Sequence, residues 1–128
     1  MQELTKAEEQ IMMILWKLEE AVVKDIIAQI PEPKPAYNTV STIVRILENK
    51  GVVSHRAEGR KHIYYPLLSK NDYKNKSLSR LVKDYFAGSL SDMVSFFSKK
   101  EKLDIKEMET IMQLMQEEID KSKKNKKE

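Results

Sequence analysis

A change of pattern between residues 52 and 67 limits the folds open to this chain. The segment there, VVSHRAEGRKHIYYPL, is rich in β-branched and aromatic residues, whereas apolar residues recur at helical spacing on both sides of it. Such residues favour strands, and Glu58-Gly59 interrupts them where a tight turn needs a positive φ. The pattern therefore predicts a β-hairpin with strands at roughly 52–57 and 61–67.

Three helical segments precede this hairpin. The first opens with Thr5-Lys6-Ala7-Glu8, a capping box in which Thr5 and Glu8 each satisfy a free backbone N–H. The second is short and stops before PEPKP, because three prolines cannot continue a helix. The third lies in AYNTVSTIVRILENKG and ends at Gly51. Three helices and a hairpin are the element order of a winged helix-turn-helix, so we expect a mainly α fold with a small β-hairpin.

The second half of the chain carries three more stripes of apolar residues at helical spacing. The first stripe ends at Gly88, the second covers about residues 90–98, and the third begins at Asp104. About 50 residues cannot bury all of these apolar side chains within one chain, so we expect a symmetric homodimer. The predicted dimerisation residues are Leu81, Tyr85, Phe86, Met93, Phe97, Met108, Ile111, Met112 and Met115. We therefore expect a winged-helix domain at 1–70, a helical dimerisation domain at 71–121 and a basic disordered tail at 122–128.

Composition excludes several classes of protein. The chain has no cysteine, which excludes disulfides and thiolate metal sites, and its two histidines are too few for the usual tetrahedral zinc site. No apolar run of about 18 residues is present, and the acidic, polar N-terminus is unlike a secretory signal. There is also no activated nucleophile and no glycine-rich phosphate loop. We therefore expect a cytoplasmic protein without enzyme activity, cofactor or membrane insertion.

The third helix has an unusual polar face. It carries Asn38, Ser41, Thr42 and Arg45, whereas exposed helix faces more often carry Glu and Lys. Short polar side chains let a helix approach another surface closely, and such groups pair with base edges in the major groove of DNA. Arg60 and Lys61 follow the hairpin turn, where they can reach phosphate, and residues 34–62 carry six Lys or Arg against two Glu, a net charge of +4. We expect this surface to bind double-stranded DNA at a palindromic site.

Two other interpretations stay open from the residues alone. One is a protein-interaction module that keeps a winged-helix fold without binding DNA. The other is a DNA-binding regulator that responds to a small ligand lodged among the methionines. The interaction module would have no reason to keep a groove-facing polar stripe, so a salt-dependent DNA-binding assay separates it from a repressor.

Four stretches of the chain resemble the penicillinase repressor family, the BlaI/MecI group of bacterial regulators. LTKAEEQIMMILWKLEEA resembles the family's first helix, L-[ST]-x-A-E-x-x-[IV]-M-x-x-[IL]-W. YNTVSTIVRILENKGVVSH resembles its recognition helix, P-K-T-[IV]-x-T-[IL]-[IL]-x-R-L-x-x-K-G-[IVL]. EGRKHIYYPL resembles its wing, and LVKDYFAGSLSDMVSFF resembles the start of its dimerisation domain. The resemblance covers essentially residues 4–120.

The resemblance implies a dimeric repressor of β-lactam-resistance or related genes. In the family a membrane sensor protease detects the antibiotic, and the repressor is then cleaved in its dimerisation region. Thr39 and Thr42 match family threonines, whereas Tyr37 and Asn38 replace Pro and Lys, which puts the family operator in doubt. The family cleaves an Asn-Phe bond, and the aligned pair here is Phe96-Phe97, which core packing explains equally well. The copper-sensing branch of the family uses cysteine pairs that this chain lacks.

Overall fold

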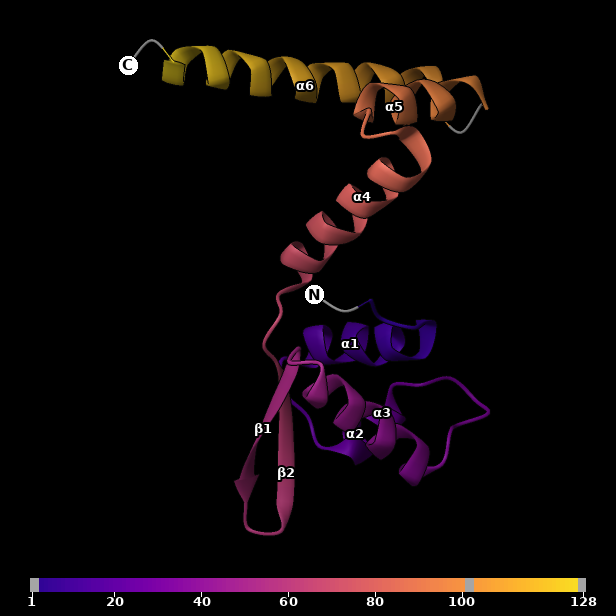
Figure 1. Ribbon diagram of the computed structural model, residues 1–128, viewed down its shortest axis with the longest axis vertical. Coiled ribbons are helices and arrows are strands. Elements are labelled where there is room, and N and C mark those ends of the chain that lie inside the picture. The colour runs from indigo at the N-terminus through magenta and orange to yellow at the C-terminus, as the bar shows by residue number, and fades with distance from the viewer. Residues whose placement is uncertain (1–2, 101–102, 127–128) are drawn as a thin grey trace. The chain divides into compact units, whose positions relative to one another are not determined.

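The computed structural model of the protein describes residues 3–100 and 103–126 (Figure 1). The elements in chain order are α1 (Lys6–Leu18), α2 (Val23–Ala28), α3 (Tyr37–Asn49), β1 (Val53–Glu58), β2 (Lys61–Pro66), α4 (Lys70–Phe86), α5 (Leu90–Lys99) and α6 (Ile105–Lys126). The predicted order of three helices, a hairpin and three further helices is confirmed. The chain forms two compact units, residues 1–77 (unit 1) and residues 78–128 (unit 2).

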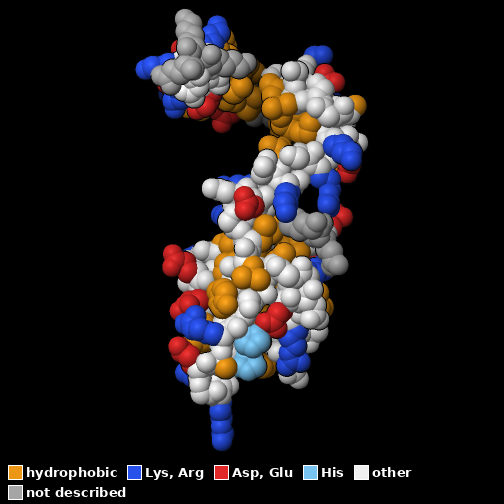
Figure 2. Space-filling view, turned by 60° about the vertical axis from the view of Figure 1, so that its left-hand side comes forward, with side chains coloured by type: hydrophobic (Ala, Val, Ile, Leu, Met, Phe, Trp, Pro, Cys, Tyr) orange, Lys and Arg blue, Asp and Glu red, His pale blue; other side chains and the backbone are white. Residues whose placement is uncertain are grey.

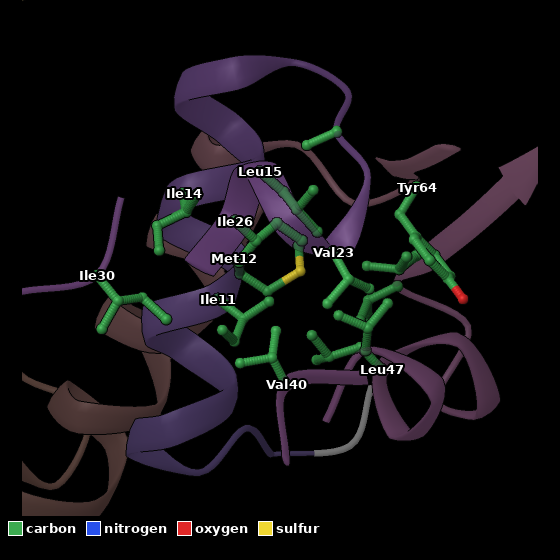
Figure 3. Packing of buried hydrophobic residues seen from close by; sticks show 14 residues of the cluster. Ile11, Met12, Ile14, Leu15, Val23, Ile26, Ile30, Val40, Leu47 and Tyr64 are labelled. Carbon is green, nitrogen blue, oxygen red and sulfur yellow. The ribbon is translucent and has the colours of Figure 1, made fainter. Parts of the chain in front are cut away.

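Unit 1 is built around one apolar core. Figure 3 shows side chains of α1, α2, α3 and β2 pointing toward one another. The side chains of Leu15, Ile26 and Leu47, one from each helix, have no exposed surface. The capping box predicted for α1 is present, since Glu8 N donates to Thr5 Oγ1 at 3.2 Å and Thr5 N donates to Glu8 Oε1 at 2.8 Å. The core therefore fixes α3 by its inner side and leaves its outer side to solvent.

The hairpin is antiparallel, and its register pairs Glu58 with Lys61 across a two-residue turn. Gly59 is the first residue of that turn and has φ +62°, a conformation that glycine adopts without steric cost. Each strand begins and ends within one residue of its predicted bounds. Tyr64 N donates to Ala21 O at 2.8 Å and Ala21 N donates to Tyr64 O at 2.9 Å, which joins β2 to the segment between α1 and α2.

Helix α4 crosses the division between the two units, which falls at 77/78. Its first turns belong to unit 1, because the Tyr73 hydroxyl donates to Glu9 Oε2 at 2.6 Å and the Tyr73 ring lies 5.6 Å from that of Trp16. The sequence pattern instead suggested a boundary at 70/71, where the helical period resumes. One aromatic side chain that anchors the start of a helix adds nothing to its helical periodicity. The sequence pattern therefore could not reveal this contact.

Unit 2 contains the rest of α4 together with α5 and α6. Asp104 Oδ1 accepts from Glu107 N at 2.7 Å at the start of α6, as the predicted helix opening requires. Helix α6 continues to Lys126, so residues 122–126 are helical where we expected a disordered tail. Lysine has a high helix propensity, and the run has neither glycine nor proline to end the helix. Residues 127–128 lie outside the described residues.

Candidate nucleic-acid interface

Helix α3 divides cleanly into an inner and an outer face. Val40, Val44 and Leu47 are at most 1% exposed and hold the helix on the core. The outer face consists of the exposed side chains on the opposite side, which are Asn38, Thr39, Thr42, Arg45, Ile46 and Asn49. Tyr37, 59% exposed, stands at the start of the helix. The packing of α3 thus presents a mostly polar face to solvent, as expected for a helix that enters a groove.

Ser41 was expected on the outer face but is only 7% exposed. Side chains on a helix advance by about 100° per residue, which places position 41 beside Val44 rather than beside Thr42. A serine on this border can be covered by the core at little cost, because its side chain is small. The prediction that Ser41 lies on the exposed face of the helix is therefore wrong.

Thr42 uses its hydroxyl hydrogen inside the helix. Its Oγ1 donates to the carbonyl oxygen of Asn38 at 2.7 Å. In this arrangement the hydroxyl oxygen can accept a further hydrogen bond but has no second hydrogen to donate. Thr42 would therefore suit a base edge that donates, whereas the neighbouring Arg45 suits one that accepts.

The wing, which is the hairpin β1–β2 with its turn at residues 59–60, carries the predicted basic residues. Arg60 and Lys61 are both exposed. Arg56 on β1 is a third basic residue of the wing, but its guanidinium donates to both carboxylate oxygens of Glu20, at 2.6 and 3.0 Å. The pair raises the pKa of Arg56 and lowers that of Glu20, mainly through these hydrogen bonds. Arg60 and Lys61 are thus better placed than Arg56 to meet an outside anion.

Two histidines connect the wing to α3. His55 Nδ1 lies 2.5 Å from Glu48 Oε2 of α3, and its ring stacks on that of His62 with centroids 4.5 Å apart. Figure 2 shows the two imidazoles side by side on the surface of unit 1. These contacts fix the wing against the C-terminal half of α3. A wing so fixed can present its basic tip at a constant distance from the outer face.

Ile46 is an outer-face residue that the sequence analysis missed. It is 41% exposed and lies one helical turn after Thr42, beside Arg45. A signal was available, because the quoted family pattern has arginine at this position and an exposed position was therefore to be expected. The outer face is consequently mixed, with one large apolar side chain among hydrogen-bonding groups.

An ion pair secures the far end of α3. Lys50 Nζ donates to Glu8 Oε1 at 2.7 Å and to the Glu3 carbonyl oxygen at 2.9 Å. Glu8 is 4% exposed. Burial alone would raise the pKa of its carboxyl group, but hydrogen bonds from Lys50 and the Thr5 backbone outweigh burial, so the pKa lies below its ordinary value. The pair joins α1 to the end of α3.

The predicted dimerisation residues lie on α4, α5 and α6, and many are open to solvent. Leu81, Tyr85, Phe97, Ile111, Met112 and Met115 are between 39% and 79% exposed. Phe86, Met93 and Met108 are partly buried. The rings of Phe86 and Phe96 contact each other with centroids 5.8 Å apart, and Phe96 and Phe97 follow at 6.4 Å. The peptide bond between Phe96 and Phe97 lies inside α5.

Within residues 3–100 and 103–126, no group of three His, Cys, Asp or Glu side chains is arranged to hold a metal ion. None of the helices in the described part of the chain is long and apolar enough to cross a bilayer.

The family model and the named proteins most similar in sequence agree on one family. The sequence model of that family, described as penicillinase repressor, matches residues 4–117. The chain is 24% identical over 116 residues to the penicillinase repressor of Bacillus licheniformis, covering 90% of this chain and 91% of that protein. It is 26% identical over 114 residues to the methicillin resistance regulatory protein MecI of Staphylococcus aureus (strain N315), covering 88% and 93%. The solution structure of the DNA-binding domain of the repressor BlaI aligns with 56% of this chain and 88% of its own, at 26% identity and a TM-score of 0.49.

Proposed function

The chain belongs to the penicillinase repressor family, whose members are DNA-binding repressors and not enzymes, and from this we propose a homodimer that binds a palindromic operator. The observation that carries the proposal is the outer face of α3. Asn38, Thr42 and Arg45 are exposed there together, while the opposite side of the same helix is sealed in the core. Such a face matches the pattern of donors and acceptors in the major groove.

In the proposed complex the wing supplies affinity, and the outer face of α3 supplies specificity. Arg60 and Lys61 neutralise phosphate groups, and the counterions they release make binding weaken as salt rises. Phosphate contacts carry no sequence information directly, so recognition of the operator falls to α3. This division of roles requires the wing to keep a fixed position relative to α3. The contact between Glu48 and His55 holds the wing there.

The second subunit is proposed from the apolar surface of unit 2. Ile111, Met112 and Met115 form an apolar strip on α6, and each is at least 39% exposed. A strip of this kind on a helix is stable when another surface covers it. A second copy is the simplest partner, and two copies related by a two-fold axis would read two half-sites about one helical turn apart or a multiple of it.

The names of the relatives point to the genes that this repressor would control. They are called a penicillinase repressor and a methicillin resistance regulatory protein, so we place β-lactam-resistance genes among the targets. Binding to an operator also implies that the protein acts in the cytoplasm. Release by cleavage between Phe96 and Phe97 stays a prediction. Because that bond lies in a helix, a protease would first have to unwind α5 to reach it.

Salt dependence tests the proposed function against a winged-helix protein that does not bind DNA. The full chain is titrated with a duplex selected by the wild-type protein from a random library, at several salt concentrations. We expect the affinity to fall steeply with salt, whereas an affinity that is weak and indifferent to salt would contradict the proposal.

Removing the two charges at the wing tip tests its role. Arg60→Ala and Lys61→Ala are each expected to weaken binding on every sequence and to lower the slope of log affinity against log salt by about 1. Lys6→Ala, which removes an exposed lysine of α1, is the matched control and should leave the slope unchanged. If the wild type and the three variants show equal slopes, the wing is not part of the DNA interface.

Arg45 is expected to read a base. Arg45→Ala should weaken binding to the selected duplex by about 1–3 kcal/mol and relax specificity at one base pair. Arg45→Lys keeps the charge without the planar fork, so it should hold random DNA as well as the wild type but discriminate less. Equal losses on selected and random duplexes would show that Arg45 only touches phosphate.

A further inference from the structure

Helix α3 carries one large aliphatic side chain on the side away from the core. Ile46 is 41% exposed, although Val40, Val44 and Leu47 already supply the buried stripe of the helix. Single exposed apolar residues are common on protein surfaces and need no explanation by themselves. The position of this one is informative because Arg45 precedes it directly and Thr42 lies one turn before it.

The chemistry of the major groove offers one apolar feature to such a side chain. Among the four bases only thymine carries a methyl group there, and apolar contact with it distinguishes thymine from cytosine. Arg45 and Asn38 can hydrogen-bond but cannot make this contact. We propose that Ile46 is a specificity-determining residue that packs against a thymine methyl in each operator half-site. This inference rests on the proposed function, because it requires the outer face of α3 to lie in the groove.

Two other methyl groups lie near enough to compete for the same role. Thr39 and Thr42 are exposed on the same face, and each has a side-chain methyl. Thr42 is also tied to the Asn38 carbonyl oxygen through its hydroxyl. Isoleucine presents a larger apolar surface than threonine. It also has no polar group that would draw the side chain away from an apolar contact. The assignment therefore goes to Ile46, and the threonines become controls.

The test removes the methyl from the DNA instead of from the protein. Duplexes selected by the wild-type protein are synthesised with each thymine replaced in turn by deoxyuridine, which differs only in lacking the methyl. At one position per half-site we expect the wild type to lose about fourfold in affinity, as burial of one methyl-sized group implies. Ile46→Ala should bind the thymine and deoxyuridine duplexes equally at that position, and Ile46→Val should discriminate less than the wild type.

The controls separate this inference from the proposed function. Thr39→Ser and Thr42→Ser remove the other methyls and keep the hydroxyls, so both should retain the wild-type loss on deoxyuridine. If no substitution with deoxyuridine affects the wild type, or if Ile46→Ala keeps the full loss, the inference is overturned while specific binding stands. If a serine variant loses the discrimination instead, that threonine is the reader and the inference is also overturned. If the wild type selects no duplex at all, the proposed function itself fails.

Discussion

Two aspartates on α6 are expected to convert the protein into a monomer that binds its operator about 10²- to 10⁴-fold more weakly. The variant is Ile111→Asp with Met115→Asp, two exposed apolar positions one turn apart. Charges there would have to be buried without partners if a second copy covered the strip, which is strongly unfavourable. The weaker binding follows because each recognition helix must then bind its half-site alone.

Sedimentation equilibrium measures the first effect and titration of the selected duplex measures the second. Thr110→Asp with Gln113→Asp is the matched control, because it adds the same charge to exposed polar positions on the other side of α6. The control should remain dimeric and bind at wild-type strength. A stable dimer formed by Ile111→Asp with Met115→Asp would place the interface elsewhere.

Breaking the Glu8–Lys50 pair is expected to destabilise unit 1 by about 3 kcal/mol. In Lys50→Met the Glu8 carboxylate keeps its burial, with its side chain 6% exposed, but loses the ammonium group 2.7 Å away. Urea unfolding followed by fluorescence reports on unit 1, because Trp16 is the only tryptophan of the chain. Lys6→Met, at an exposed site on α1, should change stability far less. Equal losses for the two variants would show that the pair contributes nothing specific.

The same pair predicts a dependence on pH. The pKa of Glu8 is lower in the folded chain than the ordinary 4.5, so the stabilisation is complete above 4.5 and is lost as the pH falls through the folded-state value. In Lys50→Met the buried Glu8 carboxylate has no cation beside it. Protonation at low pH removes this unpaired buried charge and its cost in stability. The difference in unfolding free energy between wild type and Lys50→Met should therefore narrow below pH 4.5. A difference that stays constant from pH 7 to pH 3.5 would contradict this account.

The sequence predicted elements whose signals are local. The capping box at Thr5 and Glu8 marked the start of α1, and Gly59 marked the turn of the hairpin, because each depends on residues only a few positions apart. The prolines after residue 30 marked the end of α2 in the same way. Helical periodicity also separated the buried side of α3 from its outer side at Val40, Val44 and Leu47.

Features that depend on contacts distant in the sequence were missed. The Arg56–Glu20 pair joins residues 36 positions apart and removes Arg56 from the wing charges. The contact between His55 and Glu48 joins a strand to a helix, and neither residue stood out in the sequence. Ser41 was placed on the wrong side and Ile46 was not assigned to either side, because helical periodicity does not settle how residues at the border of a face are covered. The packing of α3 decides exposure instead, covering a serine and leaving an isoleucine in solvent.

Selection of binding sites from a random duplex library tests the central claim most directly, because it assumes no operator. The full chain is incubated with the library at physiological salt, and bound duplexes are amplified and sequenced over several rounds. We expect enrichment of an inverted repeat whose half-sites lie about one helical turn apart, or a multiple of it, bound about 10³-fold or more tightly than random DNA. A library that stays random after selection would contradict a sequence-specific dimeric repressor.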